Sequence, residues 1–477
     1  MAEDDIIHTK DGTVDYQGNP ANRKKTGTWK ACPFIIGNEC CERLAYYGMS
    51  SNLGMTLLAL SASVHGIRPR CYAEDNCDPT VAQSAVFFVA LYMVALGTGG
   101  IKPCVSSYGA DQFDDTDETE KRHKSSFFNW FYFSINIGTR LYRNQKPGGS
   151  PLTRLCQVLV ASFRKVQLAV PADRTLLYEI ADAESNIRGS RKIEHTENLS
   201  FFDKAAVETE PDRIKGRVNP WRLCTVTQVE ELKAIIRLLP IWATGIIFAA
   251  VYSQMSNLFV LQGERMDTHV GNSSFKIPPA SLSIFDTLSV IFWVPIYDRI
   301  IVPVTRKFTG HKNGLTQLQR IGIGLFISIF AMIAAAMLEL ERLRLVRRHN
   351  YYERKEMPMS IFWQVPQYFL IGCAEVFTLV GQLEFFYEQA PDAMRSFCSA
   401  LQLTTIALGN YLSSLLVSIV TSISTRNGKL GWIPDNLNYG HVQNFFWLLV
   451  VLSVINLGAF LLIAKWYTYK KPVGTLR

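Results

Sequence analysis

The chain lacks the motifs by which the common enzyme classes are recognised. It has no Walker-type phosphate loop and no nucleophile triad, and its ten cysteines are scattered without the spacing of a zinc site. The N-terminus, MAEDDIIHTKDG, is acidic and polar and lacks the apolar core of a cleavable signal peptide. We therefore expect neither an enzyme nor a prosthetic cofactor or bound metal.

Charged residues are also scarce, at 19% of the 477 residues, whereas 48% are hydrophobic. The net charge of +8 could indicate nucleic-acid binding, but Lys and Arg cluster in loops between apolar runs of about 20 residues. Such runs are typical of helices that cross a bilayer, where every backbone group needs a partner within the protein. The fold class predicted is all-α and polytopic, with the lipid bilayer as a partner and no nucleic acid.

The first apolar run, 31–64, carries Glu39, Glu42 and Arg43 on one helical face. A charge in hydrocarbon costs about 2.5 to 3.5 kcal/mol or more, so such charges are kept where they are paired or face a wet cavity. This cluster is the leading candidate for a proton- or ion-coupled site. The alternative is that the charges snorkel near the membrane face.

The remaining runs suggest eight crossings with both ends in the cytoplasm. A second span is predicted at 82–106, while the run at 126–138 is too short to cross. The loop 139–233 has no periodic apolar core, and its best helical pieces are near 152–166 and 225–240. Six clear spans follow, at 235–262, 281–304, 316–340, 361–388, 397–424 and 443–468. The strongly basic segment 341–357 falls outside by this count, against the usual charge rule.

Eight motifs identify the chain as similar to the proton-coupled oligopeptide transporter family, in the plant nitrate/peptide branch of the major facilitator superfamily. They are GNECCERLAYYG (37–48), GTGGIKPCVSSYGADQFDD (97–115), SFFNWFYFSINIG (126–138), KPGGSPL (146–152), VYSQMSNLFVLQG (251–263), IPPASLSIFDT (277–287), FWQVPQYFLIGCAEVF (362–377) and EFFYEQAPDAMRS (384–396). The resemblance implies twelve spans in two six-helix halves that rock about a central site.

Against that pattern the N-terminal half is truncated. SSNL (50–53) runs directly into a segment like the end of the family's third span, and SINIG (134–138) into one like the end of the sixth. Family span two, most of three, the end of five and most of six are therefore expected to be missing. The resulting organisation is a cytoplasmic tail (1–30), an incomplete N-terminal helical bundle (31–138), a cytoplasmic central loop (139–233), a complete six-helix C-terminal bundle (234–469) and a cytoplasmic tail (470–477).

The resemblance also assigns roles in the N-terminal half. Glu39, Glu42 and Arg43 match the family's proton-coupling motif, in which a titratable carboxylate sits beside a fixed counter-charge. Tyr46 and Tyr47 match tyrosines that line the peptide site, with core packing as the alternative. A second group comprises Lys102, which matches the lysine for the substrate carboxylate or an acid partner, and Asn136, which matches an asparagine of span five.

In the C-terminal half, Glu375 matches the glutamate that holds the peptide amino terminus; the alternative is a hydrogen-bonded structural acid. Lys102 and Glu375 would then supply the two poles for a zwitterionic peptide. Tyr252, Gln254 and Asp286 are further candidates for substrate binding, as is Glu384 near the end of its span.

These assignments favour a proton-coupled symporter of di- and tripeptides. One alternative is a nitrate or small-anion carrier, although family nitrate carriers place a histidine at the position of Tyr252. Another is a transport-incompetent isoform that acts as an assembly partner or a dominant-negative form. The plasma membrane is favoured over the vacuolar membrane. The sequence leaves open the oligomeric state and whether Cys71 and Cys77, in one predicted outer loop, form a disulfide or remain free.

Overall fold

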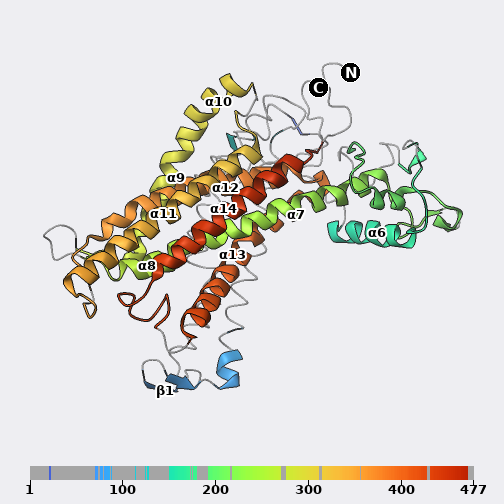
Figure 1. Cartoon of the computed structure of the whole chain (residues 1–477). Helices are drawn as coiled ribbons and strands as arrows, with labels where there is room; N and C mark the ends of the chain where they lie inside the picture. Colours follow the sequence, from blue (N-terminus) through green and yellow to red (C-terminus); the bar gives the residue numbers. More distant parts are fainter. Residues whose placement is uncertain are drawn as a thin grey trace. The chain divides into compact units, whose positions relative to one another are not determined.

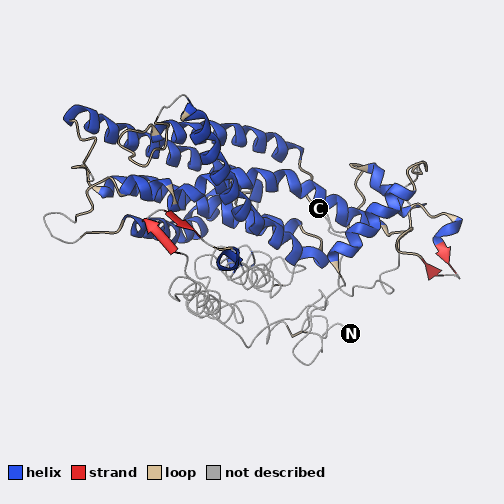
Figure 2. Ribbon diagram, turned by 90° about the horizontal axis from the view of Figure 1, so that it is seen from below, coloured by secondary structure: helices blue, strands red, loops and turns tan. Residues whose placement is uncertain are grey.

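The computed structural model describes residues 21–22, 70–73, 76–78, 80–85, 88, 113, 124, 126–127, 150–171, 173, 176–179, 192–214, 217–269, 276–310, 314–354, 356–426 and 430–470. The chain divides into two compact units, Met1–Pro147 and Gly148–Arg477. Helices make up most of the described part, as predicted, and the strands are few and short (Figure 2).

In the first unit, strands β1 (Arg70–Ala73) and β2 (Asn76–Asp78) form an antiparallel hairpin. The register places Cys71 directly opposite Cys77. Opposite residues of an antiparallel pair have Cα atoms about 4.5 to 5.5 Å apart, which is the range that a disulfide needs. The backbone therefore suits a bond between these two cysteines, and the bond itself stays a prediction.

The second unit contains the other described elements, which follow one another as a polar segment and then a helical bundle. They are α6 (Pro151–Arg164), η4 (Ser200–Ala206), η5 (Glu210–Asp212), β3 (Arg213–Ile214), β4 (Arg217–Val218), α7 (Val226–Tyr252), η6 (Ser253–Ser256), α8 (Leu258–Gly263), η7 (Pro279–Ser283), α9 (Ile284–Ile296), η8 (Tyr297–Ile301), α10 (Val302–Thr309), α11 (Gln317–His349), η9 (Ile361–Gln364), α12 (Val365–Gln389), η10 (Asp392–Met394), α13 (Arg395–Ser424) and α14 (Val442–Trp466).

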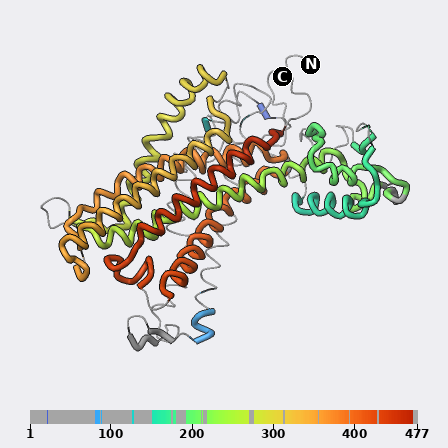
Figure 3. Tube along the Cα trace, in the orientation of Figure 1, coloured from blue at the N-terminus to red at the C-terminus, as the bar shows by residue number. Residues whose placement is uncertain are grey.

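Six helical stretches among the described residues are long and apolar enough to cross a membrane, which agrees with the six spans predicted here. They are Val226–Gly263, Pro279–Thr309, Gln317–His349, Ile361–Gln389, Arg395–Ser424 and Val442–Trp466. Helix α11 packs between α12 and α14, and α7 lies along α13 and α14 (Figures 1 and 3). Capping boxes fix two of the helix starts: Thr225 with Gln228 begins α7, and Thr316 with Gln319 begins α11.

Helix α11 contains the first part of the basic segment 341–357. The helix continues to His349 rather than ending near 340, and at 33 residues it is about 50 Å long, well beyond the hydrocarbon core. Arg342 is fully buried, and its guanidinium donates to both carboxylate oxygens of Glu339 and to Asn438. The charge of Arg342 is therefore neutralised inside the helical bundle and does not add to an exposed basic loop.

The expectation that the central loop lacks an apolar core is wrong. Helix α6, near the piece predicted at 152–166, buries Leu155, Val158 and Ala161. These side chains share a core with Ala205 of η4 and Leu232 of α7. In Figure 1 this segment extends along the first turns of α7. The core was hidden in the sequence because charged residues that are themselves buried interrupt the apolar ones.

Candidate functional site

Only part of the predicted site lies among the described residues. Seven of the predicted side chains fall outside them, namely Glu39, Glu42, Arg43, Tyr46, Tyr47, Lys102 and Asn136. The others are Glu384 and a group of four, Tyr252, Gln254, Asp286 and Glu375, and all of them belong to the second unit. The geometry that can be built is therefore the C-terminal half of the site.

Three of these four residues meet. Glu375 lies in the middle of α12 and is 5% exposed, and Asp286 lies in the first turn of α9 and is 6% exposed. The side chains of Asp286 and of Tyr252, at the end of α7, both interact with the carboxyl group of Glu375. Side chains from three different spans thus converge on one acidic centre.

Close packing of α9 against α12 holds the two acids together. A Cβ atom at Gly372 would lie 2.8 Å from both the main-chain oxygen and Oδ1 of Asp286, so only glycine permits this approach. One turn along α9, Ser289 Oγ donates to the carbonyl oxygen of Phe369 at 2.7 Å. The spacing of Gly372 and Glu375 along α12 places both on neighbouring positions of the helix surface.

Tyr252 is positioned by a break in the helical stretch Val226–Gly263. Helix α7 ends at this residue, a 3-10 turn follows, and Asn257 has φ −116° and ψ −95°, outside the helical region. The ring of Tyr252 stacks on Phe248 at 6.4 Å between centroids. The hydroxyl of Tyr368 donates to the carbonyl oxygen of Met255 at 3.3 Å, so α12 supports the break.

The structure places Gln254 away from this centre. Its side chain is fully buried, and its amide nitrogen donates to Ser413 Oγ of α13 at 2.8 Å and to the carbonyl oxygen of Ala250 at 2.7 Å. These contacts hold α7 against α13. A role for Gln254 in substrate binding stays a prediction.

Glu384 has a different environment from Glu375, although both are buried on α12. Arg320 of α11 donates to Glu384 Oε2 at 3.3 Å and to the carbonyl oxygen of Val376 at 3.0 Å. The guanidinium also lies 4.0 Å from the ring centroid of Tyr297, a cation–π distance. Glu384 therefore belongs to an ion pair that joins α11 to α12.

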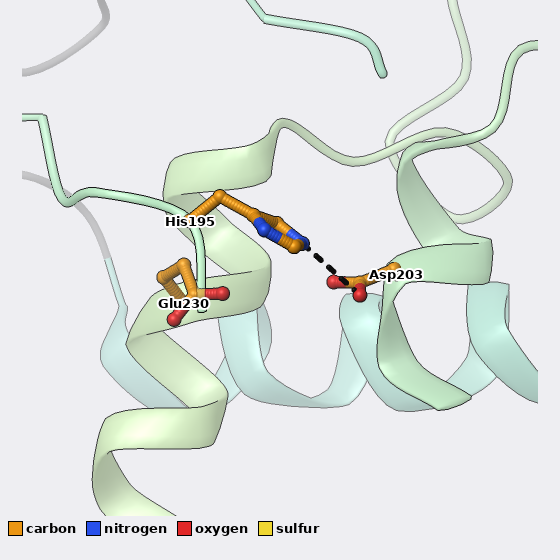
Figure 4. Close-up of side chains that lie close together, drawn as sticks. All are labelled: His195, Asp203 and Glu230. Carbon is orange, nitrogen blue, oxygen red and sulfur yellow. Dashed lines mark ion pairs between the residues drawn. The ribbon is translucent and has the colours of Figure 1, made fainter. Parts of the chain in front are cut away.

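A second group of buried charges, which the sequence reasoning missed, lies at the start of α7. Figure 4 shows His195, Asp203 and Glu230 converging there, with His195 Nε2 3.1 Å from Asp203 Oδ2. Lys233 Nζ lies 2.7 Å from Asp203 Oδ1 and 2.9 Å from Glu230 Oε1. Arg237 lies 3.0 Å from Glu230 Oε2.

This cluster is an ion-pair network rather than a metal centre. The spacing of its three acidic and histidine side chains would suit a metal ion, but both carboxylates already have a cationic partner. A metal would have to displace Lys233 from both of them, against like-charge repulsion. The spacing of Glu230, Lys233 and Arg237 on one helical face was the sequence signal for the network.

A third buried pair makes the stability of this segment depend on pH. Lys165 Nζ and the main-chain nitrogen of Thr209 donate to Asp212 Oδ2 at 2.7 and 2.8 Å. Burial alone would raise the pKa of Asp212, but these hydrogen bonds hold the pKa below the ordinary value for an aspartate. The carboxylate therefore stabilises the fold fully above the ordinary value, and the contribution is lost as pH falls through the lower, folded value.

We expect the described residues between 150 and 224 to lose protection from amide hydrogen exchange as pH is lowered below the ordinary pKa of an aspartate. In Asp212→Asn, protection should already be reduced at neutral pH and should fall less on acidification. Equal pH dependence in the two proteins, after correction for the intrinsic exchange rates, would rule out Asp212 as the titrating group.

Comparisons with known proteins agree with the geometry of a membrane transporter. The sequence profile of the POT family (PTR2) matches residues 45–140 and 137–433. The chain is 56% identical to Protein NRT1/ PTR FAMILY 8.1 of Arabidopsis thaliana, over 99% of each chain. It is also 56% identical to Protein NRT1/ PTR FAMILY 8.2 of the same plant, over 99% of this chain and 100% of the relative. An auto-inhibited POT family peptide transporter of known structure aligns with a TM-score of 0.48 at 18% identity, over 94% of this chain and 89% of that one.

The alignments also bear on the predicted truncation. The alignment with the first of these relatives runs over 567 positions, whereas the chain has 477 residues, so this chain has gaps where the relative has sequence. The two stretches matched by the family profile meet at residues 137–140. This is where the sequence predicts the second join, after SINIG (134–138).

Proposed function

Because the chain belongs to the POT family of membrane transporters, we propose that it carries di- and tripeptides across a membrane together with protons. The family and the six apolar helices make it a multi-pass integral membrane protein. We propose the plasma membrane as its location, ahead of the vacuolar membrane. Protons are the coupling ion in this proposal, and no prosthetic cofactor takes part.

The observation that carries the proposal is the acidic centre of Glu375, Asp286 and Tyr252 inside an apolar helical bundle. Burying negative charge there is costly, and a cationic ligand offsets that cost. The ammonium group of a peptide amino terminus has three donors that suit carboxylate and hydroxyl oxygens. Glu375 is the residue that we assign to this contact, with Asp286 and Tyr252 beside it.

In this proposal, residues of the first unit bind the carboxylate end of the peptide and couple its transport to protons. Lys102 would bind the peptide carboxylate, with Tyr46, Tyr47 and Asn136 lining the site. The three charges Glu39, Glu42 and Arg43 would couple proton binding to movement of the helices. We propose that an incomplete N-terminal bundle at 31–138 and a six-helix C-terminal bundle at 234–469 are joined by the central loop 139–233.

The same acidic centre argues against nitrate or another small anion as the substrate at this position. Two unit charges of like sign at contact distance repel by several kcal/mol at the effective dielectric constant of a protein, about 4 kcal/mol at 4 Å. Nitrate carriers of the family are expected to have a histidine at the position of Tyr252. In this chain the position holds a neutral phenol, which interacts with Glu375.

A second function is favoured by one observation, the internal gaps of this chain relative to its relatives. Alternating access works by the movement of one helical bundle against another around a shared site. If the gaps remove helices of the N-terminal bundle, the chain would bind peptide without completing the transport cycle. It would then act as an assembly partner or a dominant-negative form of a complete carrier.

The test is uptake of a labelled dipeptide into proteoliposomes that contain the purified full chain, with and without an inwardly directed proton gradient. We expect accumulation above the external concentration only when the gradient is present. Unlabelled dipeptide should compete, whereas nitrate and an N-acetylated dipeptide should not. Binding of dipeptide to the chain without uptake would favour the second function, and neither binding nor uptake would exclude peptide as the substrate.

A further inference from the structure

We propose that Asp267, His269 and Glu356 form a binding site for a divalent transition-metal ion of the zinc type. One ligand atom from each of these residues lies within 4.8 Å of the other two. The residues belong to two loops at the end of the helical bundle, one that follows α8 and one between α11 and η9. The site shares no residue with the acidic centre described above, so it goes beyond the proposed transport function.

Main-chain hydrogen bonds hold the two loops side by side. The nitrogen of Asp267 donates to the carbonyl oxygen of Met359 at 2.8 Å. The nitrogen of Met357, the residue after Glu356, donates to the carbonyl oxygen of Arg265 at 3.0 Å. These bonds do not involve the ligating side chains, so the backbone already brings the two carboxylates together before an ion binds.

The three side chains offer the donor atoms that zinc-type ions prefer. Imidazole nitrogen and carboxylate oxygen are common ligands of Zn²⁺, with water in a fourth position, whereas Mg²⁺ and Ca²⁺ prefer oxygen ligands alone. His269 Nδ1 lies 2.6 Å from Asp267 Oδ1, and two ligand atoms of a tetrahedral zinc ion lie about 3.3 Å apart. Both side chains are at least 35% exposed, so a small rotation opens the space that the ion needs.

The charge of the site also favours a cation. The main-chain nitrogen of His269 donates to Asp267 Oδ1 at 3.0 Å, and this bond holds the pKa of Asp267 below the ordinary value for an aspartate. Among the described residues, Asp267 has no lysine or arginine within ion-pair distance, and Glu356 has Lys276. Two carboxylates therefore face a single ammonium group.

The argument that excluded a metal from the cluster at the start of α7 does not apply to these loops. There, Lys233 is fully buried and contacts both carboxylates. Here, Lys276 contacts only Glu356, at 2.7 Å, and its side chain is 51% exposed. An exposed ion pair contributes little to stability, so Lys276 can turn into the solvent when an ion takes its place.

A bound ion would link the two loops through side chains as well as through the backbone. Amides that donate from one loop to the other should then open less often, because an ion that binds only the closed arrangement stabilises it. We expect Zn²⁺ to slow hydrogen exchange at the amides of Asp267 and Met357. The same addition should have no effect on these two amides in His269→Ala.

The direct test is a titration of the full chain in lipid nanodiscs with Zn²⁺ alone, in competition with a fluorescent zinc indicator. The affinity of the wild-type protein should fall by about tenfold or more in His269→Ala, since even the loss of a partner outside the ligand set costs about 10- to 100-fold. Asp267→Asn and Glu356→Gln should also weaken binding. Neither Mg²⁺ nor Ca²⁺ should compete.

Lys276→Met is the sharpest variant, because it should bind Zn²⁺ more tightly than the wild-type protein. The substitution removes the cation that competes for Glu356, and damage to the fold would not produce such a gain. The matched control is His349→Ala, which removes an exposed histidine at the end of α11 that stacks on Tyr351. Binding in this control should equal that of the wild type.

Equal Zn²⁺ affinity in the wild-type protein and in His269→Ala would overturn the proposal, because the ion would then bind at other histidines or cysteines. So would a wild-type protein that binds no Zn²⁺. A Lys276→Met protein that binds no more tightly than the wild type would show that Glu356 is not a ligand, and the site as stated would be wrong. These outcomes are separate from the proposed function, because no peptide and no transport are measured.

Discussion

Replacement of Glu375 by glutamine is expected to cause the largest loss of peptide binding of any single substitution in the described half of the protein. The amide keeps the size of the side chain but removes the negative charge that faces the peptide ammonium group. Truncating one member of a buried charge pair costs about 2 to 5 kcal/mol, and each 1.4 kcal/mol is tenfold in affinity. Dipeptide binding should therefore weaken by roughly 30-fold or more, as measured by radioligand binding to the purified chain.

Two controls separate the charge effect from damage to the fold. Glu341→Gln changes an exposed acid near the C-terminal end of α11 and should leave binding unchanged. An N-acetylated dipeptide lacks the ammonium group, so its weak binding should be nearly the same in wild type and Glu375→Gln. If the substitution weakens both ligands by the same factor, Glu375 does not contact the amino terminus.

The six spans of the second unit were predictable because hydrophobic length alone identifies a helix that crosses a bilayer. The residues at which these helices begin and end were harder to predict. Helix α7 begins at Val226 and α11 ends at His349, each extending past the predicted apolar run by up to about nine residues. Both extensions contain buried charges, Lys233 in α7 and Arg342 in α11. Each has one partner three residues away, Glu230 or Glu339, which the sequence spacing indicates. The second partners lie far along the chain, at Asp203 and Asn438, and no local pattern in the sequence reveals them.

The candidate site, too, was only partly predictable from the sequence. Resemblance to a family named Glu375, Asp286 and Tyr252 one at a time, with a hydrogen-bonded structural acid as the alternative for Glu375. The sequence did not reveal that all three meet, because this depends on how closely α9 approaches α12. That approach depends on Gly372, whose missing side chain leaves room for Asp286. The described structure thus adds a spatial relation between residues that the sequence named separately.

The second large effect is expected from replacing Lys233 by methionine, near the N-terminal end of α7. Lys233 is fully buried, and its ammonium group is the common partner of Asp203 and Glu230, at 2.7 and 2.9 Å. It also donates to the carbonyl oxygen of Thr196 at 2.8 Å. Methionine fills similar space but leaves two buried carboxylates short of a counter-charge. Breaking a buried ion pair in this way costs about 3 to 5 kcal/mol.

The loss should appear as local opening of the central segment rather than of the membrane helices. Amides of α6 and of Ser200–Ala206, which pack on this end of α7, should exchange more than about a hundredfold faster in Lys233→Met, at one decade per 1.4 kcal/mol. Lys276→Met is the matched control: its partner Glu356 lies at 2.7 Å, but both side chains are at least 40% exposed. An exposed pair contributes about 0 to 1 kcal/mol, so exchange in that variant should stay near the wild-type rate. Similar rates in the two variants would mean that the network around Lys233 does not hold the segment to α7.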